Sequence, residues 1–196
     1  MSRLWTPPSR LTNLGHPALA RASVPGPSTD IAEVGPFRLR PPTWQDAILV
    51  AADLRPSDRG DLAATTPETA ETIILRNLQP QRRSFAIDYQ HRCVAVCGFV
   101  DQLRPGMSVI WLLGTPGFDE ALLAGGWRLC RRWIPLMAGP RTSLFNIVPE
   151  SSARTLRWLE WLGFRRVARH TNFRALGQTC VEVHLSLAPP AMENVA

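Results

Sequence analysis

The sequence predicts an α/β fold, with one mixed central sheet flanked by helices and an extended Pro-rich arm before it. Short apolar segments typical of strands alternate with stretches that carry helix start and stop signals. In addition, 196 residues with 45% hydrophobic content suffice for one ordinary core and are too few for two full domains. We therefore expect an arm over residues 1–36, one domain over 37–188 and a short tail over 189–196.

The arm is rich in Pro, Ser, Ala and Gly, and its apolar residues show no sustained period of 2 or 3.6. Its lone tryptophan, Trp5, is a candidate contact with a partner protein. No apolar run in the chain approaches membrane-spanning length, and the N-terminus lacks the apolar core of a signal peptide. We expect a protein that is made in a cytoplasm and has no membrane segment.

From Phe37 onward the elements follow in a regular order. Thr43 and Asp46 have the spacing of a capping box that opens a first helix, and Thr66-Pro67-Glu68 reads as the start of a second. A serine N-cap and a glycine C-cap signal bound a later helix, 151–164. The predicted strands are 37–42, 83–90, 92–100, 107–115, 142–148 and a final hairpin over 164–176 and 179–189, with a further helix, interrupted by glycines and a proline, over 118–137.

The net charge is +6, and because the chain contains no lysine all 22 basic side chains are arginines. Codon bias explains that composition most simply, although guanidinium groups also suit phosphate recognition. Arginines gather late in the chain, so contact with DNA is open as an alternative to an ordinary solvated surface. The four cysteines have neither metal-ligand spacing nor the density of a disulfide framework, and are expected to be buried thiols.

The order of elements, ending in a strand, a helix with LxxLGF and a hairpin, is similar to the GNAT acyltransferase fold. Within that fold the chain resembles the small internal virion protein family of short-tailed phages. Five blocks carry this resemblance: LRPSDRGDL (54–62), IWLLGT (110–115), RLCRRWIPLM (128–137), LFNIV (144–148) and RTLRWLEWLGF (154–164). The resemblance implies a virion protein that is present in the host cytoplasm during assembly.

A GNAT enzyme holds the CoA pyrophosphate on a glycine-bearing loop of the form Q/R-x-x-G-x-G/A. The corresponding stretch here, PGFDEALLAGGW, has Gly117 but also Asp119 and Glu120, two carboxylates where an anion would sit. The pair Gly125-Gly126 comes late, inside the expected helix. If CoA does bind, Thr115 and Gly117 are the candidate contacts.

Such enzymes commonly protonate the departing thiolate with a tyrosine, the second residue of an LYxxLGF-type segment. That position is Leu159 here, and leucine cannot donate a proton. Trp158 and Trp161 are interpreted as part of the packing stripe of this helix rather than as ligand-stacking residues. Asn146 and Glu150 are weak catalytic candidates, with a structural hydrogen bond favoured for Asn146 and a solvated position for Glu150 and Asp101.

The block LRPSDRGDL is the most polar of the five. We interpret it as a loop between the first two helices that is salt-bridged by Arg55, Asp58, Arg59 and Asp61. The alternative is a docking or substrate surface, with Arg55, Asp58 and Arg59 as candidate partner contacts.

These observations favour a non-catalytic structural protein of a phage virion, tethered by its arm to portal, tail or internal core subunits and needing no cofactor. The first alternative is an active acetyl-CoA-dependent N-acyltransferase, and the second an accessory DNA-binding virion protein.

Overall fold

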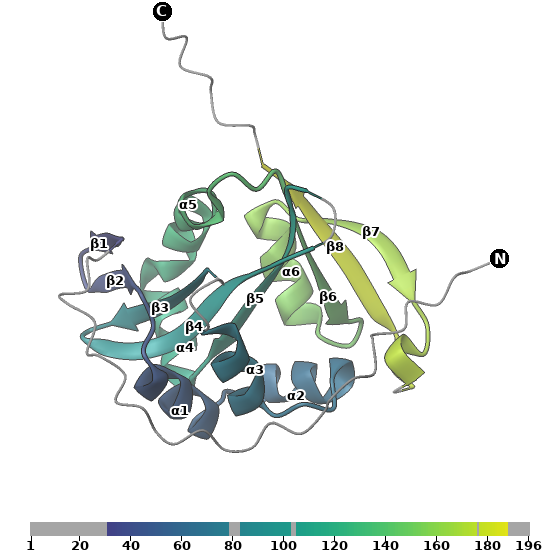
Figure 1. The fold of residues 1–196 in the computed structure, drawn as a ribbon, viewed down its shortest axis with the longest axis horizontal. Helices are drawn as coiled ribbons and strands as arrows, with labels where there is room; N and C mark the ends of the chain where they lie inside the picture. The colour runs from purple at the N-terminus through teal and green to yellow at the C-terminus, as the bar shows by residue number, and fades with distance from the viewer. Residues whose placement is uncertain (1–30, 79–82, 103–104, 176, 188–196) are drawn as a thin grey trace, which may run out of the picture.

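The computed structural model describes residues 31–78, 83–102, 105–175 and 177–187, which form an 8-stranded sheet flanked by helices (Figure 1). The strand order is β1-β2-β3-β4-β5-β6-β8-β7. Neighbouring strands are antiparallel except β5 and β6, which run parallel. This architecture confirms the predicted fold class. Trp5 lies outside the described residues, as do the rest of 1–30 and the tail.

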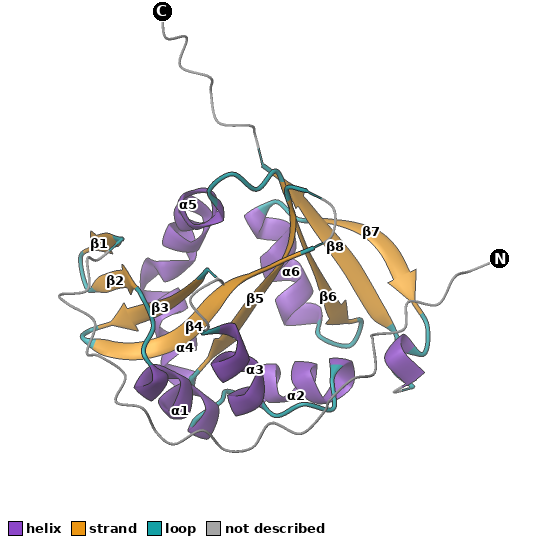
Figure 2. Ribbon diagram, in the orientation of Figure 1, coloured by secondary structure: helices purple, strands orange, loops and turns teal. Residues whose placement is uncertain are grey.

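The elements alternate along the chain much as the sequence predicts (Figure 2). The strands are β1 (Ala32–Val34), β2 (Phe37–Arg40), β3 (Ser84–Tyr89), β4 (Arg92–Asp101), β5 (Met107–Gly114), β6 (Ser143–Pro149), β7 (Arg165–His170) and β8 (Cys180–Ser186). The helices are α1 (Trp44–Ala52), α2 (Pro56–Thr65), α3 (Ala70–Asn77), α4 (Pro116–Ala121), α5 (Trp127–Ala138) and α6 (Ala153–Leu162). A π-helical turn, η1 (Leu122–Gly126), joins α4 to α5, and a 3-10 turn, η2 (Phe173–Ala175), lies between β7 and β8.

Strand β1 lies within the stretch that the sequence assigns to the arm. It pairs antiparallel with β2, with Val34 opposite Phe37, and the Ile31 N–H donates to the Leu39 carbonyl at 2.9 Å. Gly35, with φ 57°, makes the tight turn between the two strands. The domain therefore begins at residue 31 at the latest, and the predicted boundary at 36 is corrected by this strand.

The start of α1 follows the predicted capping box. The Thr43 hydroxyl accepts from the Asp46 N–H, and the Asp46 carboxylate accepts from the Thr43 N–H. Helix α3 begins later than predicted, because its N-cap is Thr69, whose hydroxyl accepts from the Thr72 N–H. The prediction at Thr66 was wrong by about one turn.

Helix α2, like strand β1, is an element that the sequence did not predict. The block LRPSDRGDL was interpreted as a loop, but residues from Pro56 onward form a helix, with Pro56 in the first turn and Asp58 near the positive end of the helix dipole. Gly60 and the polar composition hide the helix, since its residues give a weak amphipathic pattern.

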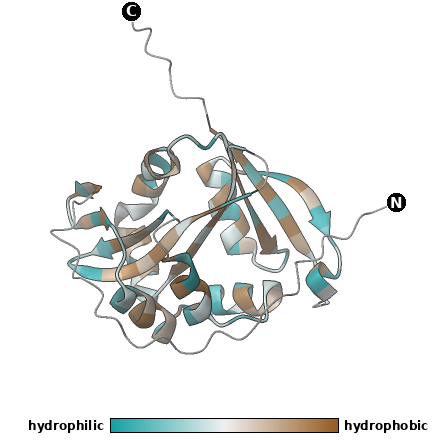
Figure 3. Cartoon of the chain, in the orientation of Figure 1, coloured by the Kyte–Doolittle hydropathy of each residue, from teal (hydrophilic) through white to brown (hydrophobic). Residues whose placement is uncertain are grey.

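Buried apolar side chains form two clusters, one on each face of the sheet. Figure 3 shows the apolar residues along the strands and the helices that supply these clusters. On one face Val50 of α1 and Ile74 of α3 pack with Leu113 of β5. On the other, Phe118 of α4, Trp133 of α5 and leucines of α6 pack with the remaining strands. Because side chains alternate along a strand, β5 sends Trp111 and Leu113 to the first face and Ile110 and Leu112 to the second.

Helix α6 packs through Leu156, Leu159 and Leu162, which are all buried, and ends at Gly163 in the left-handed conformation. The predicted packing stripe is thus confirmed for the leucines. Trp161 is different, because it is 38% exposed and stands edge-on to Trp127 of α5 at 4.3 Å between ring centroids. Ser152 is the N-cap residue, as the serine signal predicts, but its hydroxyl donates to Asp61 and makes no capping hydrogen bond.

Within the described part of the chain, the four cysteines are free and buried, as predicted. The same residues contain no cluster of three or more His, Cys, Asp or Glu side chains that could hold a metal ion. None of the helices in the described ranges is long and apolar enough to cross a membrane.

Candidate functional site

The sheet opens between its two parallel strands. β5 and β6 pair only from Met107 to Val109 opposite Ser143 to Phe145. Beyond these pairs β5 stays on β4 as far as Gly114, and β6 stays on β8 as far as Pro149. The facing edges of residues 110–114 and 146–149 are therefore not joined by the described ladder, and the sheet splays into a wedge (Figure 1).

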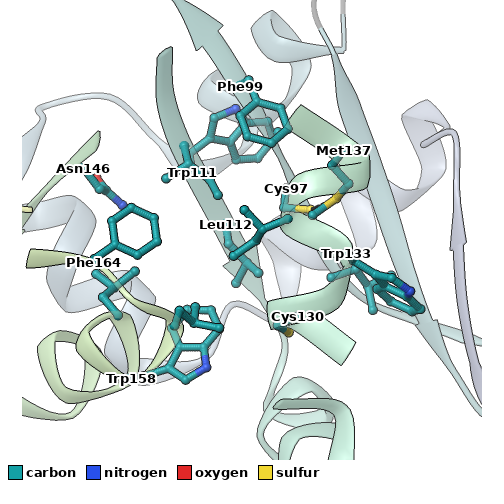
Figure 4. Close-up of a pocket in the computed structure, with 16 residues that line it drawn as sticks. Cys97, Phe99, Trp111, Leu112, Cys130, Trp133, Met137, Asn146, Trp158 and Phe164 are labelled. Carbon is teal, nitrogen blue, oxygen red and sulfur yellow. Dashed lines mark hydrogen bonds between the residues drawn. The ribbon is translucent and has the colours of Figure 1, made fainter. Parts of the chain in front are cut away.

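A cavity of about 50 Å³ lies on the α5 and α6 side of this wedge, and we call it the helix-side cavity. Its walls are almost wholly apolar, and the polar side chain of Asn146 lines it from β6 (Figure 4). Among the labelled side chains, Leu112, Cys130, Trp133, Trp158 and Phe164 surround the space.

A second cavity of about 130 Å³ lies on the other side of the wedge, facing α2, and we call it the α2-side cavity. It is more polar, because α2 contributes Asp58, Asp61 and Thr65, and α6 contributes Thr155. The two cavities share the side chains at the wedge itself: Trp111, Leu112, Asn146, Trp158 and Leu159. They therefore meet where the strands separate, so the wedge can be reached from both faces of the sheet.

An open groove of about 400 Å³ lies outside the α2-side cavity, and we call it the outer groove. One wall is α2, and the other is the segment between β6 and α6, with Gln178 at its edge. Asp61 and Pro149 line both the outer groove and the α2-side cavity. The groove and the α2-side cavity therefore adjoin at these two residues.

Arg55 ties α2 to the end of β5. Its Nη2 lies 2.8 Å from Asp58 Oδ1, its Nη1 lies 3.0 Å from Asp119 Oδ1, and its guanidinium stands over the Phe118 ring. Asp58 in turn accepts from the Gly114 N–H at 2.8 Å. Burial raises the pKa of Asp58 above its ordinary value, and Arg55 and the Gly114 N–H act in the opposite direction.

This network corrects the docking alternative for the block. Arg55 and Asp58 are only 7% and 5% exposed, so they are not available to a partner protein. The predicted salt bridge does form, but on a helix rather than on a loop. Arg59 is exposed, and its Nη2 donates to the Leu54 carbonyl at 3.2 Å.

The network also reduces the repulsion that the sequence predicts between Asp119 and a bound phosphate. Its carboxylate contacts two arginines, Arg55 at 3.0 Å and Arg154 of α6 at 3.3 Å. Because an ion pair offsets the charge, Asp119 repels a nearby phosphate far less than the sequence suggests. Gly125, with φ 102°, breaks the helical run between α4 and α5, so the glycine pair precedes α5 instead of lying inside it.

Asp61 has a different environment from Asp58. Its carboxylate accepts from the Ser152 hydroxyl and, at 3.3 Å, from the Thr155 hydroxyl, which are both neutral groups. Burial raises the pKa of Asp61 above its ordinary value, and the neighbouring charge of Asp58 adds to this effect. In the sequence Asp61 is one residue of the polar block and nothing singles it out, because its place at the cavity mouth depends on a helix that was not predicted.

Trp158 and Leu159 face the wedge from α6. Leu159, at the position where the fold commonly has tyrosine, is 4% exposed and lines both cavities. The indole N–H groups of Trp158 and Trp111 are buried, and no acceptor among the described residues lies within hydrogen-bonding distance of either. Buried donors without a partner are rare in folded proteins and favour sites that bind an acceptor group.

The remaining candidate residues lie in two places, Asn146 at the wedge and Thr115 with Gly117 at the start of α4. Asn146 lines both cavities, and its Oδ1 accepts from the Ile147 N–H at 2.7 Å, the structural bond that was expected. Thr115 is the buried N-cap residue of α4, and its hydroxyl donates to the Val94 carbonyl at 3.2 Å. Gly117 follows in the first turn, where a Cβ would lie 3.2 Å from a Val94 methyl group.

The other two carboxylates considered in the sequence, Glu150 and Asp101, lie elsewhere. Glu150 is exposed and paired with Arg169, which lowers the pKa of Glu150. Asp101 accepts from Ser108 and Arg141, and these hydrogen bonds lower the pKa of Asp101 although desolvation opposes them. Neither residue lines the cavities at the wedge.

The chain matches no protein-family model, and no curated protein is similar to it in sequence. Solved structures are similar in fold. The ribosomal-protein-S18-alanine N-acetyltransferase from Escherichia coli is 14% identical over 80% of this chain and 98% of its own, with a TM-score of 0.58. The ribosomal-protein-S5-alanine acetyltransferase from Vibrio fischeri is 12% identical over 79% and 95%, with a TM-score of 0.57.

A variant of the spermidine N-acetyltransferase from Vibrio cholerae is 10% identical over 77% of this chain and 94% of its own, with a TM-score of 0.59. These proteins share the architecture of GNAT acetyltransferases. The chain thus has the GNAT fold, as the order of its elements implied.

Proposed function

We propose that this protein is an acyl-CoA-dependent acyltransferase that acts on an amine. The observation that carries the proposal is the wedge between β5 and β6, reached by one cavity from each face of the sheet. Two substrates that enter from opposite faces can meet there, which is the arrangement an acyl transfer requires. The similar structures include acetyltransferases whose named substrates are protein alanines and spermidine, all of them amines.

The residues at the wedge fit an acyl-CoA. Its pantetheine arm carries amides, and the backbone edge of residues 110–113, which the β6 ladder does not pair, offers partners for them. At Gly114 the N–H and the carbonyl already bind Asp58 and the Arg55 N–H. Arg128 and Arg131 are exposed at the start of α5 and supply positive charge for phosphates. When bound, acyl-CoA supplies a thioester whose acyl carbon an amine can attack.

The chain's own residues have distinct tasks at this site. The apolar helix-side cavity excludes water from the wedge, which strengthens polar interactions there. The Trp158 N–H provides a hydrogen-bond donor beside Leu159, where the usual tyrosine is missing. An indole does not ionise near neutral pH, so Trp158 orients a polar acceptor and leaves proton transfer to other groups.

The test is calorimetric titration of the full chain with acetyl-CoA. We expect saturable binding for wild type and for Leu136→Trp, whose site is exposed on α5, and at least about tenfold weaker binding for Leu112→Trp, which fills the wedge. Circular dichroism shows whether each variant is folded. No heat and no thermal shift for the wild type would exclude the acyltransferase proposal.

The virion role stays a prediction, and its support is the five-block sequence resemblance alone. A non-catalytic GNAT module tethered to portal, tail or core proteins would use the same fold as a rigid body, and the wedge would have no task in it. Its test is deletion of residues 1–30, which spares β1, followed by assay of incorporation into phage particles. Contact with DNA is a further prediction, to be tested by the salt dependence of DNA retention.

A further inference from the structure

Asp61 stands at the passage between solvent and the wedge. It is one of two residues, with Pro149, that line both the outer groove and the α2-side cavity. A molecule that enters by the groove therefore passes the Asp61 carboxylate before it reaches Asn146 and Trp158 at the wedge.

Among the described residues no cation contacts the Asp61 carboxylate directly, and Arg55 acts on its charge only from a distance. Ser152 and Thr155 each donate one neutral hydroxyl hydrogen bond to it. Arg55, the cation of this region, is engaged by Asp58 and Asp119, and the ion pairs of the described residues leave Asp61 without a cationic partner. Since an ionised carboxylate accepts about four hydrogen bonds, Asp61 has capacity for a further donor.

The walls of the groove indicate the shape and charge of what can enter. Gly60, Ala63 and Ala64 on α2 face Pro149 and two serines, so the lining side chains are small. No arginine is among the described residues that line the outer groove, which makes it unsuited to phosphate or nucleic acid. A slender chain with a positive end matches both features.

We propose that Asp61 binds the ammonium group of the acceptor and takes its proton, so that the acceptor is a slender primary amine entering by the outer groove. This inference rests on the proposed acyltransferase function. One ammonium proton passes to the Asp61 carboxylate and from there to solvent in the groove. The freed nitrogen lone pair forms the C–N bond to the acyl carbon as the C–S bond breaks, and a second nitrogen proton neutralises the departing thiolate.

Asp61 also has the geometry that a base in this position needs. It lies on a helix whose other acid, Asp58, is fixed by Arg55 and by the Gly114 N–H, so α2 is held against the end of β5. Ser152 and Thr155 hold the carboxylate from α6 and the segment before it. A carboxylate fixed by two elements is pre-organised for its substrate.

The test uses n-butylamine as the acceptor probe and n-butanol as its neutral counterpart. Binding to the full chain is measured by ligand-observed NMR, and transfer by thiol release from acetyl-CoA together with mass detection of N-butylacetamide. We expect wild type to bind the amine and not the alcohol, and Asp61→Asn to bind the amine about tenfold or more weakly. Asp61→Asn should still bind acetyl-CoA.

Two further variants serve as controls. Asp53→Asn removes an exposed carboxylate that lines none of the cavities described above, and should bind the amine like wild type. Ser152→Ala removes one of the two hydrogen bonds that hold the carboxylate but leaves its charge, and should weaken amine binding less than Asp61→Asn does, which separates charge from local structure.

Equal amine binding by Asp61→Asn and wild type, or no amine binding by wild type, would overturn the inference. Because amine binding is measured without acetyl-CoA, this failure is distinct from that of the proposed function. The latter would appear as a wild type that does not bind acetyl-CoA.

Discussion

Arg55 shows how a single side chain holds the site together. It is the cation for two carboxylates, Asp58 and Asp119, that come from different helices. A buried ion pair adds little to stability compared with apolar residues of the same size, but loss of one partner leaves an unpaired buried charge. The three residues are best understood as one unit that fixes α2 to the end of β5.

Arg55→Met should therefore destabilise the protein by about 3 kcal/mol, because Asp58 stays buried without its cation. Urea unfolding followed by circular dichroism measures this cost. Arg59→Met is the matched control on the exposed side of α2, and should change the unfolding free energy by less than about 0.5 kcal/mol. Equal costs for the two variants would show that the ion pairs contribute nothing particular.

Leu159 offers a test of the missing proton donor. Leu159→Tyr places a hydroxyl at the wedge, in the position where the fold commonly carries one, and should raise the rate of transfer to n-butylamine by about tenfold. The larger side chain should cost about 1–3 kcal/mol of stability.

The control for this gain is Leu156→Tyr, because Leu156 belongs to the same buried stripe but lines neither cavity. It should lose stability with no increase in rate. A rate for Leu159→Tyr at or below that of wild type would contradict the assigned role of the position.

At the scale of elements, the break between α4 and α5 depends on two adjacent glycines for different reasons. Gly125 has φ 102°, but nothing lies within 4 Å of the Cβ that a substitution would add. Gly126 has helical angles, but its Cβ would come within 2.7 Å of the Ala121 carbonyl and 2.9 Å of the Phe37 ring.

Gly125→Ala should accordingly cost only the backbone strain, about 1 kcal/mol, whereas Gly126→Ala should cost about 2 kcal/mol or more because its neighbours are backbone and core. Thermal unfolding of both variants under identical conditions gives the order. A larger loss for Gly125→Ala would refute this explanation of the break.

The elements that sequence predicted are those whose signals are local. Thr43 with Asp46 and Gly163 after Leu162 mark helix ends through hydrogen bonds to their own backbone, so they can be read along the chain. Helix α2 was missed because its burial comes from Arg55 and Asp58, polar residues that pair only in the folded protein. The wedge could not be predicted at all, since it depends on where β5 and β6 stop pairing.

Across the whole molecule, some carboxylates stabilise the fold when they are ionised, and others reduce its stability when they are ionised. Asp46 accepts hydrogen bonds from Arg40 and Thr43, and these lower its pKa although burial opposes them. A carboxylate with a lowered folded-state pKa stabilises the fold above its unfolded pKa, and this stability is lost as the pH falls through the folded value. Asp46→Asn should therefore lower the melting temperature at pH 7, and the difference from wild type should shrink as the pH falls below 3.8, the ordinary pKa of an aspartate.

Asp61 has the opposite effect on the pH dependence of stability, because burial beside the α2-side cavity raises its pKa. Its folded-state pKa is raised by burial, so its contribution to stability is present below the unfolded value of 3.8 and is lost as the pH rises through the folded value. Asp61→Asn should then melt at or above the wild-type temperature at pH 7, and the advantage should disappear in acid. Melting curves of wild type, Asp46→Asn and Asp61→Asn between pH 3 and pH 7 provide the comparison. A clear loss of stability for Asp61→Asn at pH 7 would mean that Asp61 is held for structure, whereas stability retained with amine binding lost is the pattern of a residue held for function.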